Sequence, residues 1–260
     1  MHSIEAHGLI KTYPAPGKAR VRALDGLTLT VGRGTIFALV GPNGAGKTTT
    51  VKILTTLARP DAGSAAVEGI DVIAAPAQAR RVIGVVGQRS GADPGATGRE
   101  NLILQGHLYG MPARAARSRA DELLDRFRLT DAAGRFVRTY SGGMQRRLDV
   151  ALGLVHQPRV LFLDEPTTGL DPESRAAMWD EITTLATADQ VTVLLTTHYL
   201  DEADRLASAL AIVDQGRVVA VGNPAQLKRD LGADSLDEVY LHHAGRRYSD
   251  ATRVTEVAGR

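Results

Sequence analysis

A glycine-rich segment that ends in a lysine and a threonine is the stretch of the chain best suited to phosphate chemistry. Residues 41–48 read Gly-Pro-Asn-Gly-Ala-Gly-Lys-Thr and match the pattern GxxxxGK[ST]. The glycines let several backbone N–H groups face an anion, and the start of a following helix adds partial positive charge. Lys47 supplies a full charge, and the Thr48 hydroxyl suits Mg²⁺. We therefore expect a nucleoside triphosphate and Mg²⁺ to be bound by Gly41, Asn43, Gly44, Gly46, Lys47, Thr48 and Thr49.

The segments on either side of this phosphate loop have the expected character. Residues 36–40 form a short apolar run, and apolar residues recur at positions 51, 54 and 57. The order strand, loop, helix is the context in which the pattern binds phosphate, and a chance match in such a context is improbable.

Two adjacent carboxylates end a second apolar run. Residues 160–163 are Val-Leu-Phe-Leu, and Asp164 and Glu165 follow directly. Charge at the end of a buried strand is costly unless a cation or a reacting group lies there. Asp164 suits a Mg²⁺ site opposite Thr48, and Glu165 can accept a proton from an attacking water. A pair of solvated loop acids is the weaker alternative.

Polar residues also follow other predicted strands. Gln88 comes after the run 82–86, and His198 after the run 191–197. Ligands gather at the carboxyl ends of strands in open parallel sheets, so His198 is expected at the site although a lone histidine is more often structural. Tyr13, ahead of the phosphate loop, is by itself a packing residue, but together with a nucleotide site it suits stacking on a base.

A second glycine pair opens a helix. Ser141 is a natural N-cap, followed by Gly142 and Gly143 and then by an apolar stripe at positions 144, 148, 152 and 155. Each glycine costs roughly 0.5–1 kcal/mol in a helix, which favours close approach by an anion. Because the phosphate loop is already a complete cradle, we expect this helix tip to face a nucleotide held by another copy or a partner.

The remaining sequence patterns predict the other strands and helices of an α/β fold. Strands are predicted at residues 3–10, 27–31 and 67–72, with a turn at 60–63 and with residues 11–13 outside the first strand. Residues 98–128 are predicted to be helical and to belong to an inserted helical subdomain. A helix at 173–186 and a hairpin at 209–221 follow, and the last ten residues are expected to be disordered.

Composition sets limits on location and partners. The 260 residues are 43% hydrophobic, enough for one large domain, and the formal net charge of +2 requires no nucleic acid as a partner. Cysteine is absent, which excludes disulfides and thiolate metal sites and favours a cytosolic location. The N-terminus shows no leader pattern, and the apolar runs are far shorter than the ~20 residues of a membrane span. Another chain would have to span a membrane.

These segments together resemble the ATP-binding subunits of ABC transporters over residues 3 to about 225. Tyr13 takes the place of the adenine-stacking aromatic. Residues 41–48 match Walker A, Gln88 matches the hinge glutamine, and residues 141–143 match the family signature. Asp164 and Glu165 match Walker B, 169–171 the D-loop and His198 the switch histidine.

The resemblance implies a P-loop NTPase core with a mainly parallel sheet flanked by helices, an N-terminal antiparallel β part and an inserted helical subdomain. It implies an ABC-type domain over 1–225, with its core at 1–88 and 158–222 and the helical subdomain at about 89–157. A C-terminal helix and tail would occupy 226–260.

The resemblance further implies a head-to-tail dimer that binds ATP and Mg²⁺ at its interface and drives a membrane permease from the cytoplasmic face. Walker A of one subunit and the signature of the other hold each ATP, with Asp171 also at the site. Glu165 would polarise the water, His198 would contact the γ-phosphate, and Gln88 would sense Mg²⁺ and water. We expect the permease to contact residues 89–109.

One departure from the family pattern concerns the signature. It reads Tyr-Ser-Gly-Gly-Met over 140–144, whereas the commonest form begins with Leu and ends with Gln. Met144 supplies no side-chain amide, so that contact must come from the backbone or be absent. This variant, together with 97–102 and 236–241, resembles the drug- and antibiotic-export branch typified by the daunorubicin-resistance ATP-binding subunit.

Other classes of nucleotide-binding protein fit less well. A small GTPase needs an NKxD segment, which the sequence lacks, and chromosome-condensing relatives carry a long coiled coil. Translation-factor relatives carry two nucleotide domains. A stand-alone soluble regulator without a permease is the remaining alternative.

Overall fold

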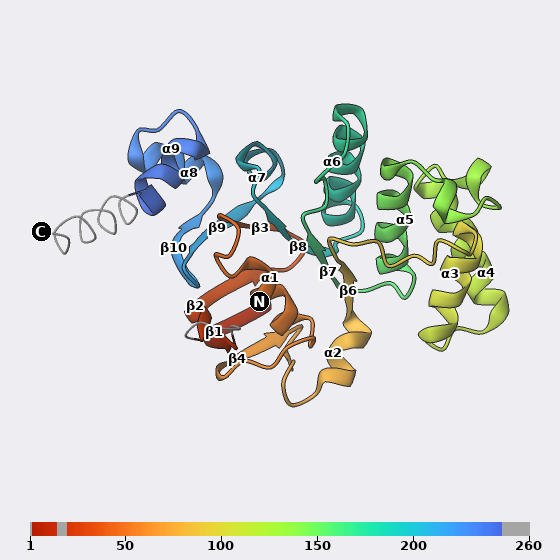
Figure 1. Ribbon diagram of the computed structural model, residues 1–260, viewed down its shortest axis with the longest axis horizontal. Coiled ribbons are helices and arrows are strands. Elements are labelled where there is room, and N and C mark those ends of the chain that lie inside the picture. Colours follow the sequence, from red (N-terminus) through yellow and green to blue (C-terminus); the bar gives the residue numbers. More distant parts are fainter. Residues whose placement is uncertain (1, 15–19, 246–260) are drawn as a thin grey trace, which may run out of the picture.

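A six-stranded sheet forms the centre of the protein in the computed structural model, which describes residues 2–14 and 20–245 (Figure 1). Its strand order is β10-β9-β3-β8-β7-β6. The five strands from β9 to β6 run parallel, and β10 pairs antiparallel with β9 at one edge. The strands are β3 (Ile36–Val40), β6 (Ile83–Val86), β7 (Val160–Asp164), β8 (Thr192–Thr197), β9 (Ala209–Asp214) and β10 (Arg217–Gly222).

Burial on both faces explains why the inner strands are rich in apolar residues. All residues of β3, β7 and β8 are buried. Successive side chains alternate between two hydrophobic cores, as the pleat requires: Ile36 and Ala38 enter one core, and Phe37 and Leu39 enter the other. The central sheet therefore separates the two cores.

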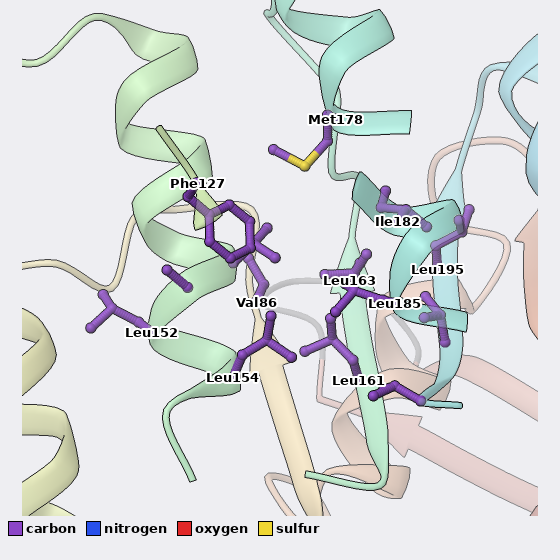
Figure 2. Close-up of a cluster of buried hydrophobic side chains, with 14 of the residues drawn as sticks. Val86, Phe127, Leu152, Leu154, Leu161, Leu163, Met178, Ile182, Leu185 and Leu195 are labelled. Carbon is purple, nitrogen blue, oxygen red and sulfur yellow. The ribbon is translucent and has the colours of Figure 1, made fainter. Parts of the chain in front are cut away.

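The first core lies between the central sheet and the helices that follow it. Figure 2 shows Leu161 and Leu163 of β7 between Leu154 of α5 and the α6 residues Ile182 and Leu185. The helices of the described chain are α1 (Lys47–Leu54), α2 (Pro76–Val82), α3 (Gly98–Leu108), α4 (Ala113–Arg126), α5 (Gly142–Leu154), α6 (Pro172–Thr187), α7 (Leu200–Leu206), α8 (Pro224–Leu231) and α9 (Leu236–Tyr240), with short 3-10 turns at Thr130–Ala132 and Val137–Thr139 and a π-helical turn at Leu241–Gly245.

The second core lies between the central sheet and a smaller antiparallel sheet, and α1 contributes to it. The smaller sheet has the order β2-β1-β4-β5 and consists of β1 (His2–Tyr13), β2 (Val21–Gly32), β4 (Ala62–Val67) and β5 (Ile70–Asp71). This is the predicted N-terminal antiparallel β part. Asp25 of β2 joins the two sheets through an ion pair with Arg217 of β10.

Helices α3, α4 and α5 lie together at one end of the molecule, while α8 and α9 lie at the opposite end (Figure 1). Thr97 and Glu100 form a reciprocal capping box that starts α3, with the Thr97 N–H donating to the Glu100 carboxylate at 2.8 Å. Among the described residues, no helix combines the length and the apolar character needed to cross a membrane.

One strand prediction and one turn prediction in the N-terminal half were wrong. Residues 67–72 form a hairpin, because the backbone turns at Glu68 (φ 52°) and Gly69 (φ 75°) between β4 and β5. The segment 60–63 was predicted as a turn, but β4 already begins at Ala62.

Two further local predictions need correction, and one lies outside the described residues. β1 continues through residues 11–13, since Tyr13 pairs with Val21. Helix α2 was missed because Ala79 is its only buried residue, so it has no apolar period to detect. The predicted disorder of the last ten residues concerns a segment that lies beyond the described part of the chain.

The helical end of the molecule approaches the sheet at a contact between two glycines. A Cβ placed on Gly84 of β6 would lie 2.2 Å from the carbonyl oxygen of Gly153 in α5. Only a glycine at position 84 allows α5 to lie this close to the strand that leads to Gln88.

Replacing Gly84 tests this contact. We expect Gly84→Ala to lower the free energy of unfolding by about 1–3 kcal/mol through overpacking, measured by urea denaturation. Gly91→Ala is the matched control, because its Cβ would meet no atom within 4 Å. Equal midpoints for the two variants would contradict the close approach.

Candidate functional site

The polar residues singled out in the sequence follow four neighbouring parallel strands. The phosphate loop follows β3, His198 follows β8, Asp164 and Glu165 stand at the end of β7, and Gln88 follows β6. Because the carboxyl ends of parallel strands meet at one edge of the sheet, these segments lie side by side along that edge. The predicted site residues from four separate segments therefore come together.

The phosphate loop takes backbone conformations that favour glycine. Gly44 has φ 84° and Gly46 has φ 113°, and a Cβ on Gly46 would lie 2.7 Å from the carbonyl oxygen of Ala23 in β2. Asn43 and Gly44 are exposed, so the outer side of the loop is open. This cradle fits a phosphate group, and a side chain at position 46 would collide with β2.

The Lys47 ammonium group is buried beneath this loop. It donates to the carbonyl oxygens of Gly41 at 2.6 Å and of Pro42 at 3.1 Å. Burial lowers the pKa of Lys47, while the nearby carboxylates of Glu165 and Asp164 raise it in opposition. Asp164 and Glu165 are thus close enough to the phosphate loop for both carboxylates to interact with the Lys47 ammonium.

Asp164 and Glu165 are held in different ways. Asp164 is buried, with 7% of its surface exposed, and its carboxylate accepts a hydrogen bond from the Thr196 hydroxyl. Glu165 has φ 50°, a left-handed conformation that costs a non-glycine residue on the order of 1–3 kcal/mol. Its backbone N–H donates to the carbonyl oxygen of Thr196 at 3.1 Å. The carboxylates of the two adjacent acids consequently have different partners.

The Glu165 carboxylate lies beside His198. One oxygen is 3.3 Å from Nδ1 of His198, and the other accepts from the Thr168 hydroxyl at 3.2 Å. Glu165 also lines a cavity of about 250 Å³ that Gln88 and Gly142 share. The structure therefore brings three of the predicted segments to one space.

The donor set fits a Mg²⁺ ion. The Asp164 carboxylate is near the Lys47 ammonium, and the Thr48 hydroxyl, at the start of α1, is partly exposed. Hard oxygen donors of this kind are those that Mg²⁺ prefers. When bound, the ion neutralises charge on the β- and γ-phosphates. We propose Thr48 and Asp164 as the protein ligands of the ion, with Gln88 at the edge of the Mg²⁺ site.

The tip of α5 has the predicted N-cap, and one of its two glycines also packs against α6. The Ser141 hydroxyl caps the helix by accepting from the Met144 N–H at 3.2 Å, and Gly142 is exposed, so that a Cβ added to it would meet no atom within 4 Å. A Cβ on Gly143 would lie 2.6 Å from the Ser174 hydroxyl of α6. Packing against α6 is thus a second reason for a glycine at position 143, and the contact of Gly142 and Gly143 with an anion stays a prediction.

Asp171 and Tyr13 have structural partners as well. The Asp171 carboxylate caps α6 by accepting from the Ser174 N–H at 2.9 Å, and this hydrogen bond lowers its pKa. The Lys11 ammonium lies 5.5 Å from the centre of the Tyr13 ring. The structure does not bring either residue into the cavity beside Glu165, and their roles at the nucleotide stay predictions.

Sequence reasoning missed two buried charged residues behind the site. Arg146 of α5 donates to main-chain oxygens of the segments that carry Gln88 and Glu165. Glu202 of α7 accepts from the Thr167 hydroxyl at 2.7 Å and from Trp179 Nε1 at 3.0 Å. Nothing in the local sequence separates Arg146 from its neighbour Arg147, and one acid among several in 201–204 carries no signal.

The fold and the site define a P-loop NTPase whose phosphate loop, acid pair and histidine stand at adjacent strand ends. A family model described as "ABC transporter" matches residues 24–168. The chain belongs to the ABC transporter family.

Known proteins similar to this chain are ATP-binding proteins and cassettes. It is 51% identical over 252 residues to the daunorubicin/doxorubicin resistance ATP-binding protein DrrA of Streptomyces peucetius, covering 97% of this chain and 74% of the relative. It is 43% identical over 238 residues to the Nod factor export ATP-binding protein I of Ralstonia nicotianae, covering 91% of this chain and 72% of that relative.

A solved structure supports the same fold. A dimeric ATP-binding cassette in a post-hydrolysis state, bound to ADP and Pi, matches with a TM-score of 0.77 and 26% identity over 85% of this chain and 98% of that chain. The protein is an ABC ATPase, which binds ATP with Mg²⁺ and hydrolyses it in transport. ATP-binding subunits of this family dimerise and work with a membrane permease.

The role of Glu165 is tested by removing its ability to accept a proton. We expect Glu165→Gln to lower kcat for ATP hydrolysis by about 10²–10⁴, the range typical for loss of a general base, while ATP still binds. Phosphate release and the binding of a fluorescent ATP analogue measure the two quantities. Glu173→Gln, an exposed acid in the first turn of α6, serves as the control. Wild-type turnover in Glu165→Gln would exclude the role.

Proposed function

We propose that this chain is the ATP-hydrolysing subunit of an ABC exporter for a hydrophobic, drug- or lipid-like compound. It works as a dimer on the cytoplasmic face of the membrane, coupled to a separate permease chain. The observation that carries the proposal is the meeting of the phosphate loop, Glu165 and Gln88 at neighbouring strand ends, together with the exposed glycine tip of α5.

In the proposed dimer, each ATP lies between two copies. The phosphate loop and Lys47 of one copy hold the triphosphate, and the exposed tip of α5, with Ser141 and Gly142, contacts it from the other. The N-terminus of a helix with free N–H groups favours an anion, which supports this arrangement. A ligand that binds both copies drives closure only because it binds the closed dimer better.

In hydrolysis, Glu165 accepts a proton from the attacking water. His198 Nδ1, 3.3 Å from the Glu165 carboxylate, orients that carboxylate in the free protein. His198 contacts the γ-phosphate once ATP is bound, and Gln88, which lines the same cavity as Glu165, orients the water. These roles follow the chemistry of the groups at the strand ends.

The proposed cargo follows from what similar proteins do. The names of the similar Streptomyces and Ralstonia proteins refer to drug resistance and to Nod factor export. In the proposed exporter, the pocket that binds this compound belongs to the permease. The nature of the cargo therefore rests on similarity of sequence and not on any pocket in this chain.

The proposed permease contact lies on the helical side, within the predicted segment 89–109 and beside it. Leu108 is 73% exposed and Tyr109 40% exposed, and the nearby Leu57 is 69% exposed. Leu57 and Tyr109 line a mainly apolar cavity of about 150 Å³, and the Tyr109 ring stacks on His156 at 3.7 Å. The exposed apolar side chains of Leu57 and Tyr109 at this cavity, with Leu108 next to Tyr109 in sequence, support a protein contact.

Dimerisation is tested at the tip of α5. We expect Ser141→Arg to leave ATP binding by the single copy intact and to block ATP-induced dimerisation, because the added side chain occupies the space next to Gly142. Light scattering with and without ATP measures the effect. Ala115→Arg, at an exposed position on α4, is the control. A dimer that forms equally in both variants would exclude the contact.

The membrane partner is tested by co-purification. A polytopic membrane protein should accompany the tagged chain in mild detergent, and Tyr109→Glu should reduce its yield because a charge replaces an apolar contact, with exposed Asp180→Asn as the control. Recovery of the chain without any membrane protein would favour the alternative of a stand-alone ATPase with a regulatory role.

A further inference from the structure

The side chain of Arg146 connects three segments around the candidate site. It lies on α5, one turn from the tip, and only 9% of its surface is exposed. Its guanidinium group donates four hydrogen bonds to main-chain oxygens. The acceptors are Gly87 at 2.6 Å, Pro166 at 2.8 Å, Asp164 at 3.0 Å and Glu165 at 3.2 Å.

These bonds join the ends of two neighbouring strands to one helix. Gly87 precedes Gln88 after β6, and Asp164 and Glu165 stand at the end of β7. A guanidinium group is planar and holds its donors in fixed directions, so it sets the separation of its acceptors. Arg146 consequently fixes the distance between the segment of Gln88 and the segment of Glu165.

Asp149, one turn further along α5, holds the other end of the Gln88 segment. Its carboxylate accepts from the Ser90 hydroxyl at 2.8 Å and from the Gly91 N–H at 3.0 Å. Gln88 thus lies between two points of attachment to the same helix.

The bond to Glu165 bears on its backbone conformation. The left-handed φ of 50° persists only when the surroundings determine it from both sides. Thr196 of β8 holds the Glu165 N–H, and Arg146 holds the Glu165 carbonyl oxygen. The direction of the carboxylate depends on that conformation.

We propose that Arg146 is a positioning residue for ATP hydrolysis, which holds the Glu165 carboxylate and the Gln88 amide in register with the tip of α5. The inference rests on the proposed function, because it takes Glu165 as the general base. Arg146 acts through the main chain of residues 87 and 164–166, whose carbonyl oxygens accept all four of its hydrogen bonds.

The first test is Arg146→Lys in the full chain. A lysine keeps the charge but carries its donors on a single nitrogen, which cannot reach both segments at once. We expect kcat to fall by about 10–100-fold, the scale of a misplacement near 1 Å, with KM and the affinity for a fluorescent ATP analogue little changed.

Arg147→Lys is the matched control. Arg147 is the next residue of α5 and also donates to main-chain oxygens, those of Phe127 at 3.0 Å and Arg128 at 3.5 Å, away from the site. Thermal unfolding of both variants measures any general loss of stability. An equal kcat in the two variants, or a loss of ATP binding that parallels the loss of kcat, would overturn the proposal.

A double-mutant cycle with Glu165→Gln gives the second test, which a purely structural role would not satisfy. If Arg146 acts through Glu165, Arg146→Lys should lower the residual kcat of Glu165→Gln by less than about 3-fold. If Arg146→Lys lowered kcat by the same factor in the wild-type and the Glu165→Gln proteins, the positioning role would be refuted while the general-base role of Glu165 would stand. Wild-type turnover in Glu165→Gln by itself would defeat the general-base role, and the inference with it. Arg146→Gln, which keeps hydrogen-bond donors without charge, repeats the cycle should Arg146→Lys not fold.

Discussion

Burial of the central sheet on both faces is the constraint on which the rest of the structure depends. A strand such as β7, covered by α5 and α6 on one side and by the second core on the other, has room only for apolar side chains. Charged groups can stand only where the strands end and the backbone leaves the core. Since β3, β8, β7 and β6 are parallel neighbours, their ends meet, and the reactive groups are gathered at one edge.

The same constraint sets the electrostatics of the site. Lys47 is buried under the phosphate loop, and its charge is accommodated by two carbonyl oxygens and two nearby carboxylates. In such a partly dry environment, charges interact more strongly than in water, so the acid pair and the lysine act on one another across the loop. A triphosphate enters a site where positive charge is already fixed in place.

Much of this site was predictable because its signals are local. The phosphate loop needs glycines within eight residues, and the acid pair follows directly on an apolar run. The N-cap at Ser141 was identified from its own side chain and from the helix that follows it. His198 could be placed because a parallel sheet gathers its strand ends.

The features that escaped prediction depend on contacts between distant segments. Arg146 is set apart from Arg147 only by what lies opposite each in space. The packing of Gly143 against Ser174 on α6 is likewise invisible in the sequence. Helix α2 has one buried residue and no apolar period. For Arg146 and Gly143 the neighbours that matter are remote along the chain, so the local sequence does not reveal them, whereas α2 has no local signal at all.

The oxygens that Arg146 contacts all belong to the main chain, and this has a consequence for how the sequence can vary. A carbonyl group is present whatever side chain a residue carries. Substitutions at positions 87 and 164–166 therefore do not remove the carbonyl oxygens that accept from Arg146. Pro166 illustrates the point, since a residue without an N–H still offers its carbonyl oxygen at 2.8 Å. The donors of this contact therefore depend on one side chain, that of Arg146. The acceptors are carbonyl oxygens, which every residue type provides.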